Sequence, residues 1–189
     1  ILVPPTKNEG FSQIIHFTKI EEINHQLKLW KLDPIEGQID TRFFKFPRTR
    51  HLFNLGSATR DDLLLTPVEQ KEFLNCKVYV EEKVDGANLG ISIDPDTYGV
   101  QFQNRSHFVT SNYHKQFEKL DTWLGKNSIG LFEIIEPGRH ILFGEWLYMK
   151  HSINYVNLPG YFVAFDLYDR KEKKFYSRNR LEELLSKAN

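Results

Sequence analysis

The chain has 189 residues, with 25 Lys+Arg, 25 Asp+Glu and a formal net charge of +0 at pH 7. This balance excludes a uniformly basic nucleic-acid coat protein, although it leaves room for a local basic patch. Hydrophobic residues make up 40% and aromatic residues 14% of the chain, which excludes wholesale disorder. The one cysteine, Cys76, cannot form an internal disulfide, and no apolar run approaches the roughly 20 residues that span a bilayer. We therefore expect an intracellular protein, cytoplasmic or nuclear, without a membrane partner.

The first third of the chain carries little regular pattern. Apolar residues recur at helical spacing over residues 19–31, and the residues that follow show no clear period. We interpret residues 1–65 as an N-terminal extension that holds one helix and an irregular segment. Residues 66–189 then form the main domain.

The main domain alternates between helical signals and apolar strands. Thr66-Pro67-Val68-Glu69 combines a capping residue, a proline at the first helical position and a closing glutamate, which predicts a helix from 67 to about 75. Ser111 and Ser177 are capping candidates for two further helices, the first over residues 112–125. Apolar runs predict strands at residues 78–80, 89–93, 99–104, 141–148 and 161–168, with a turn at 94–96 and a charged hairpin loop at 169–174. This order predicts an α+β fold with largely antiparallel strands and flanking helices.

Four short motifs carry the candidate chemistry. The first is Lys83-Val84-Asp85-Gly86, which follows the predicted strand at 78–80. A Lys-x-Asp-Gly match arises by chance in roughly 4% of chains this long, and Asp-Gly is also typical of a type I′ hairpin turn. The other three motifs follow in order as Gln103-Asn104-Arg105-Ser106, Leu142-Phe143-Gly144-Glu145-Trp146 and Tyr161-Phe162-Val163-Ala164-Phe165-Asp166.

The order and spacing of these motifs resemble those of the covalent nucleotidyltransferases, which comprise the ATP-dependent polynucleotide ligases and the mRNA capping enzymes. The resemblance extends over about residues 77–185. Asn88 stands five residues after the lysine, where DNA ligases and capping enzymes usually carry arginine, and Glu82 immediately precedes the lysine. In both positions the chain is similar to the phage nick-sealing RNA ligases, as it is in the stretch from His151 to Tyr155.

The resemblance implies an ATP-grasp-like nucleotidyltransferase domain. Its implied activity is to join RNA 3′-hydroxyl and 5′-phosphate ends, in nicked duplex or broken RNA, through a lysine–AMP intermediate. Lys83 is the implied catalytic nucleophile, with ATP and Mg²⁺ (or Mn²⁺) as cofactors. The implied ATP- and AMP-binding residues are Glu82, whose backbone would recognise adenine, Asn88 near the phosphates, Arg105 at the ribose or the RNA end, Glu145 at the ribose hydroxyls, and Phe165 stacked on the base.

Some alternatives stay open at individual positions. Asp85 is either a polar residue of the site or a turn former, Glu145 also fits a strand-end ion pair, and Phe165 also fits a core position. Two later motifs of the superfamily, a metal-binding glutamate and a Lys-x-Lys pair, have no match here. The metal ligands therefore stay unassigned, and we expect the nucleotidyltransferase domain, residues 66–189, to be incomplete at its C-terminal end.

A basic cluster lies upstream, in Lys45-Phe46-Pro47-Arg48-Thr49-Arg50-His51. Cations among aromatic residues in irregular backbone suit contacts to phosphate, so Arg48, Arg50 and His51 are nucleic-acid candidates. The alternative is an ordinary solvated loop. For the whole chain, the alternatives to an RNA ligase are an ATP-dependent DNA ligase and a nucleic-acid-binding module with a degenerate site.

Overall fold

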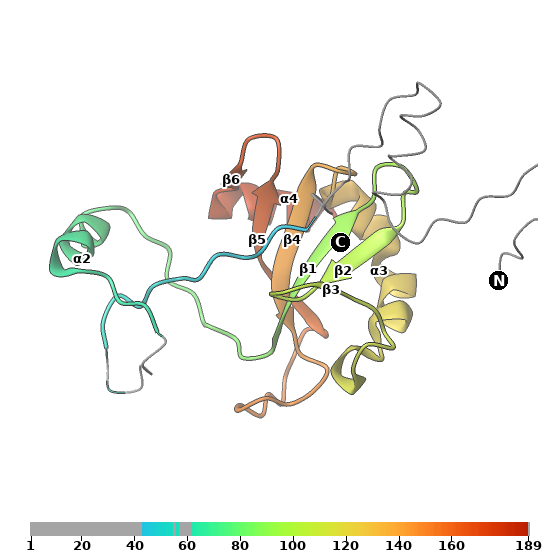
Figure 1. The fold of residues 1–189 in the computed structure, drawn as a ribbon, viewed down its shortest axis with the longest axis horizontal. Helices are drawn as coiled ribbons and strands as arrows, with labels where there is room; N and C mark the ends of the chain where they lie inside the picture. Colours follow the sequence, from blue (N-terminus) through green and yellow to red (C-terminus); the bar gives the residue numbers. More distant parts are fainter. Residues whose placement is uncertain (1–42, 55, 57–61, 189) are drawn as a thin grey trace, which may run out of the picture. The chain divides into compact units, whose positions relative to one another are not determined.

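The computed structural model describes residues 43–54, 56 and 62–188 of the chain (Figure 1). The helix predicted over residues 19–31 lies outside these residues. Phe43–Asn189 form one compact unit. In the described part of the chain, no helix is long and apolar enough to cross a membrane.

A six-stranded antiparallel sheet forms the centre of this unit. Its strands are β1 (Ala87–Ile93), β2 (Val100–Gln103), β3 (Phe108–Val109), β4 (His140–Trp146), β5 (Phe162–Asp169) and β6 (Lys174–Phe175). They lie in the order β3-β2-β1-β4-β5-β6, and every neighbouring pair is antiparallel. The described helices are α2 (Pro67–Leu74), α3 (Leu120–Ile134) and α4 (Arg178–Lys187). The predicted α+β fold with antiparallel strands is thus confirmed.

Two of the predicted helix starts are also confirmed. At α2, the Thr66 hydroxyl accepts a hydrogen bond from the Glu69 N–H, and the Glu69 carboxylate accepts one from the Thr66 N–H at 2.9 Å. At α4, the Ser177 hydroxyl accepts a hydrogen bond from the Arg180 N–H. Both helices begin where a side-chain oxygen satisfies backbone donors that have no partner inside the helix.

The two faces of the sheet have different partners. Because side chains alternate along a strand, Leu89 and Ile91 of β1 and Leu142 and Trp146 of β4 share one face. These residues are buried in an apolar core with side chains of α3 and α4. The other face of β4 presents Ile141 and Phe143 to a smaller aromatic cluster.

This aromatic cluster is completed by the strap, which we define as residues 43–51. The Phe44 ring stacks on Tyr168 with 3.7 Å between centroids, and the Phe46 ring lies 4.9 Å from Phe143 and 5.3 Å from Phe165. The Gln103 side chain donates a hydrogen bond to the Phe44 carbonyl at 2.7 Å. The strap therefore lies against the face of the sheet opposite α3 and α4.

A β-bulge interrupts the pairing of β4 with β5. Phe143 pairs with Asp166, but the next residue, Gly144, pairs with Ala164, so β5 holds one extra residue at Phe165. A bulge resets the alternation of side chains along a strand. As a result Phe165 and Asp166, although consecutive, both line the same cavity.

Two predicted elements are wrong. Residues 78–80 pair with none of the described strands, and Val80 is 91% exposed, because β-branched composition alone does not make a strand without a partner. In place of a helix over 112–125, a 3₁₀ turn at Lys115–Phe117 precedes α3, which begins only at Leu120. Ser111 caps nothing, since its hydroxyl donates a hydrogen bond to Asp121. The two-residue strand β3 is too short to give a sequence pattern.

Candidate active site

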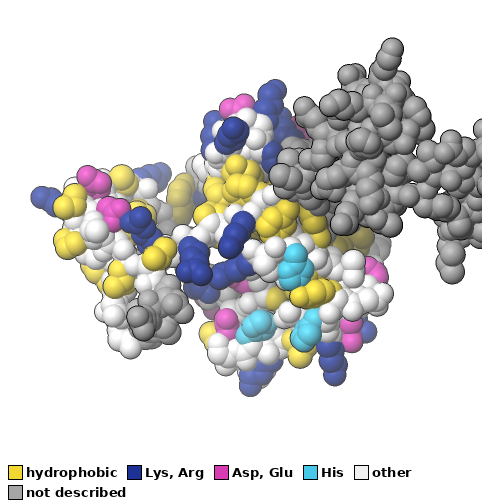
Figure 2. Space-filling model, viewed as in Figure 1, with side chains coloured by type: hydrophobic (Ala, Val, Ile, Leu, Met, Phe, Trp, Pro, Cys, Tyr) yellow, Lys and Arg dark blue, Asp and Glu magenta, His cyan; other side chains and the backbone are white. Residues whose placement is uncertain are grey.

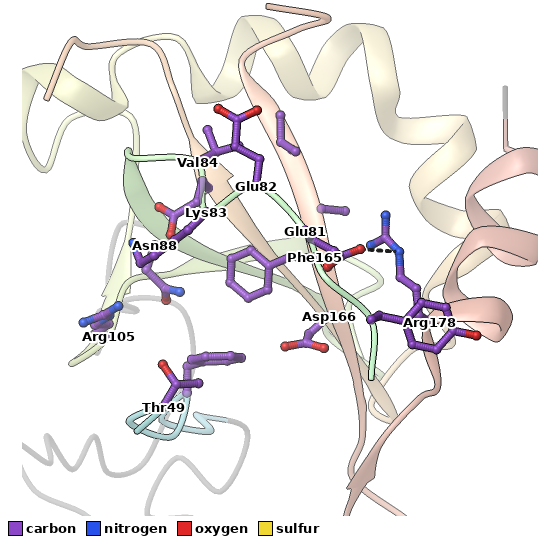
Figure 3. A pocket seen from close by; sticks show the side chains of 15 residues that line it. Thr49, Glu81, Glu82, Lys83, Val84, Asn88, Arg105, Phe165, Asp166 and Arg178 are labelled. Carbon is purple, nitrogen blue, oxygen red and sulfur yellow. Dashed lines mark ion pairs between the residues drawn. The ribbon is translucent and has the colours of Figure 1, made fainter. Parts of the chain in front are cut away.

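One cavity of about 590 Å³ opens on the strap side of the sheet, and we call it the central cavity. Its lining includes all six residues that the motifs single out, namely Glu82, Lys83, Asn88, Arg105, Glu145 and Phe165. Figure 3 shows Lys83, Asn88 and Arg105 on one side of the Phe165 ring, and Asp166 and Arg178 on the other. The Glu82 carboxylate points away from that ring (Figure 3). Residues spread over more than 80 sequence positions thus meet at one site.

The segment that carries Lys83 is held by tertiary contacts on its upstream side. The Tyr79 hydroxyl donates a hydrogen bond to the Asn179 side chain at 2.6 Å. The Glu81 carboxylate pairs with the Arg178 guanidinium at 2.7 Å, at the first turn of α4 (Figure 3). These contacts position an irregular segment without the help of a strand.

On the downstream side, the same segment is tied to the loop after β4. The Asp85 N–H donates to the Tyr155 hydroxyl at 2.8 Å, and the Asp85 carboxylate accepts hydrogen bonds from both the N–H and the hydroxyl of Ser152. These two hydrogen bonds lower the pKa of Asp85. Asp85 therefore does not form a turn. Its carboxylate instead binds the loop after β4 through Ser152.

Gly86 explains why the motif ends in glycine. The Gly86 backbone does not have the positive φ of a type I′ turn, since the positive-φ glycines of the described chain are Gly56 and Gly138. A Cβ at position 86 would instead lie 2.7 Å from the Trp146 carbonyl oxygen and 2.7 Å from Leu147. Glycine is therefore required by the close approach of the backbone to the end of β4.

Two polar side chains in the cavity have buried atoms without partners. Asn88 of β1 and Glu145 of β4 are directly opposite each other in the register of the sheet. Both amide atoms of Asn88 and the Oε2 atom of Glu145 are buried and have no hydrogen-bond partner in the part of the chain that the structure describes. Because such groups are normally paired in folded proteins, they indicate a site for a polar ligand.

Two carboxyl groups of the cavity, those of Glu145 and Asp166, have perturbed pKa values. Burial raises the pKa of Glu145 above its ordinary value, and the positive charges of Lys83 and Arg105 oppose this rise. Burial also raises the pKa of Asp166 to about 6, with a further rise from the charge of Glu81 and an opposing effect of Arg178. Perturbed carboxyl groups that line a cavity are typical of functional sites.

Arg105 lies at the tip of a tight turn between β2 and β3. The Asn104 side-chain oxygen accepts hydrogen bonds from the N–H groups of Ser106 at 2.8 Å and His107 at 2.9 Å. The Asn104 N–H donates to the His107 carbonyl at 2.9 Å. This turn brings the exposed Arg105 side chain to the same cavity as Lys83.

The three candidates in the strap are separated by the structure. Arg48 and His51 line a second pocket, the strap pocket, together with Lys83 and Arg105. Arg50 does not line this pocket, because its guanidinium pairs with the Glu69 carboxylate at 2.6 Å. Figure 2 shows basic side chains gathered near the middle of the face on view.

Sequence reasoning missed several residues of the central cavity. These are Thr49 and Phe46 of the strap, Tyr79, Glu81, Asp166 and Arg178. Asp166 carried a signal, since it completes the Phe-Asp motif, whereas Glu81 and Arg178 are recognised only by their contact across the fold. Among the described residues, no three His, Cys, Asp or Glu side chains are grouped to hold a metal ion. We therefore assign no metal ligands.

Comparison with known proteins identifies the family of the chain. A protein-family model described as RNA ligase matches residues 77–189, which is more than half of the chain and includes all four motifs. Searches among curated proteins and among solved structures gave no match. From the extent of the family match, we conclude that the chain belongs to the RNA ligase family.

Proposed function

We propose that the protein is an ATP-dependent RNA ligase that joins 3′-hydroxyl and 5′-phosphate ends through AMP bound covalently to Lys83. One observation carries the proposal: Lys83 shares a cavity of about 590 Å³ with buried polar atoms of Asn88 and Glu145 that have no hydrogen-bond partner among the described residues. A cavity of this size suits a nucleotide.

The proposed roles follow from the chemistry of each side chain. The Phe165 ring offers a flat face for the adenine base, and such stacking is worth roughly 1–3 kcal/mol. The Glu145 carboxylate has acceptor sites for ribose hydroxyl groups, and the Asn88 amide can donate to a phosphate oxygen. Arg105 adds positive charge near the same phosphates.

The reaction then has three steps. First, the Lys83 amine loses a proton and attacks the α-phosphorus of ATP, so that an N–P bond forms and pyrophosphate leaves. Second, an oxygen of the RNA 5′-phosphate attacks the AMP phosphorus, the N–P bond breaks, and the lysine nitrogen takes up a proton. Third, the RNA 3′-hydroxyl loses its proton to solvent and attacks the phosphorus of the RNA 5′-phosphate, so that a phosphodiester bond forms, the anhydride bond to AMP breaks, and AMP leaves. Mg²⁺ or Mn²⁺ bound with the nucleotide would neutralise charge on the phosphates.

Intact-protein mass after incubation with ATP and Mg²⁺ tests the first step. We expect the wild-type protein to gain the mass of one AMP and Lys83→Arg, which keeps the positive charge, to gain none. Absence of the adduct from the wild-type protein, or its persistence in Lys83→Arg, would contradict the proposal. Nicked duplexes with RNA or DNA on the 3′-hydroxyl side then separate RNA ligation from the DNA ligase alternative.

A further inference from the structure

We propose that the strap pocket binds the 5′-phosphate end of the RNA. This inference rests on the proposed function, because it assigns a place to one of the two RNA ends. The pocket, of about 560 Å³, lies between the strap and the turn that carries Arg105. The described residues of its charged lining are Lys45, Arg48, His51, Asp62, Lys83 and Arg105.

The charge of this pocket suits a phosphate monoester. Among the described residues that line it, four fixed cations and a histidine face one carboxylate, Asp62, which lies 3.5 Å from the His51 ring. In the described part of the chain, neither Lys45 nor Arg48 forms an ion pair. A terminal phosphate carries between one and two negative charges near pH 7, and an internal phosphodiester carries one, so a cluster of cations favours the terminus.

The strap presents these cations from a fixed backbone. At one end, the stacked Phe44 and Tyr168 rings and the hydrogen bond from Gln103 hold it against the sheet. At the other end, the His51 N–H donates to the Leu63 carbonyl at 2.7 Å, and the His51 carbonyl accepts from the Leu65 N–H at 3.0 Å. Contacts that order a segment before its ligand binds reduce the conformational entropy that binding costs.

The position of the pocket relates it to the chemistry. Phe46, Thr49, Lys83 and Arg105 line both the strap pocket and the central cavity, so the two spaces adjoin at the proposed nucleophile. A phosphate in the strap pocket therefore lies next to the place where AMP would be attached. The cations of the strap are exposed, which leaves the pocket open to the rest of an RNA strand.

The test uses one short single-stranded RNA in two forms, with a 5′-phosphate or a 5′-hydroxyl, labelled at its 3′ end. Binding is measured by fluorescence anisotropy without ATP. We expect the wild-type protein to prefer the 5′-phosphate form. Lys45→Gln and Arg48→Gln should each raise the Kd for that form about tenfold, the effect of losing one charge-assisted hydrogen bond, and should remove most of the preference.

Arg50→Gln is the matched control, because Arg50 belongs to the strap but is paired with Glu69 outside the pocket. The Kd of this variant for the 5′-phosphate RNA should stay within about twofold of the wild-type value, since an exposed ion pair contributes little to stability. Circular dichroism of each variant confirms folding. If Arg48→Gln raised the Kd for both RNA forms equally, the assignment would be overturned, because the strap would then bind the phosphodiester backbone and not the 5′-phosphate.

A second measurement separates the RNA phosphate from the outer phosphates of ATP. In the mass assay, Arg48→Gln should leave the ATP concentration for half-maximal AMP uptake within about twofold of wild type. A tenfold rise in that concentration with unchanged RNA binding would overturn the inference. Since anisotropy needs no AMP transfer, 5′-phosphate binding through Arg48 in a protein that takes up no AMP would support the pocket and refute the ligase mechanism.

Discussion

The buried amide of Asn88 leads to the sharpest prediction, which concerns the change Asn88→Leu. Both amide atoms of this side chain are buried without a hydrogen-bond partner within residues 43–54, 56 and 62–188, and the residue is only 9% exposed. Leucine has the same number and branching of side-chain heavy atoms as asparagine and no polar atoms. We therefore expect Asn88→Leu to stabilise the ligand-free protein and to weaken nucleotide binding.

The magnitude follows from the cost of an unpaired buried group, which is about 1–3 kcal/mol. For a protein of this size, each kcal/mol shifts the melting temperature by roughly 2–4 °C, so we expect a rise of about 2–12 °C. The lost hydrogen bond to a charged phosphate is worth about 1.5–3 kcal/mol, which predicts at least a tenfold loss of AMP uptake at limiting ATP.

Urea unfolding and thermal melting measure the first effect, and the mass assay for AMP uptake measures the second. Ser92→Ala is a matched control, because Ser92 lies on the same face of β1 and its buried hydroxyl also has no hydrogen-bond partner among the residues described. It does not line the central cavity, so its removal should not impair AMP uptake. A lower free energy of unfolding for Asn88→Leu would refute the reasoning, since the amide would then have a stabilising partner in the free protein.

Two further predictions concern stability. Because the pKa of Asp166 is about 6 in the folded protein and 3.8 ordinarily, its contribution to stability falls as pH rises from about 4 to about 6 and is constant above. Asp166→Asn should remove this loss of stability, which screening by solvent in the open cavity limits to about 1–2 kcal/mol. Urea unfolding should therefore show a higher free energy of unfolding for the variant at pH 7.5 but not at pH 4. Gly144→Ala should destabilise by about 1–3 kcal/mol, because its Cβ would lie 2.5 Å from the Val163 carbonyl oxygen, whereas Gly125→Ala, in open space on α3, should stabilise by about 0.5–1 kcal/mol. Equal effects of the two alanines on the urea midpoint would contradict this packing argument.

The sequence predicted the elements whose signals are local. The capping residues Thr66 and Ser177 hydrogen-bond within their own helix, so their role is visible in a few consecutive letters. The strand predicted at residues 78–80 was wrong because a strand needs a neighbouring strand to pair with. The local sequence pattern does not show whether such a neighbour is present. The helix predicted from residue 112 failed for a related reason, since Phe117 and Leu120 are both buried but belong to two different helical segments.

The candidate site also has features that the sequence shows and features that depend on contacts across the fold. The motif residues meet at one cavity because the order of strands β1, β4 and β5 brings their ends together, and the order of the motifs was readable in the sequence. The strap was readable only as a group of cations. Whether a cation of the strap can bind a ligand depends on whether it already forms an ion pair. Arg50 pairs with Glu69, 19 residues away, whereas Arg48 has no ion-pair partner among the described residues.

Because of the bulge, the number of residues in β5 matters as well as their identity, since it decides on which face of the sheet each side chain lies. Its upstream half pairs with Gly144–Trp146 and its downstream half with residues 140–143, and the single extra residue connects the two registers. Deleting one residue at this point would place either the aromatic ring or the carboxylate on the helix side of the sheet, even if every other side chain were kept. Substitutions in β5 can therefore be compensated one at a time, but a change in its residue count cannot.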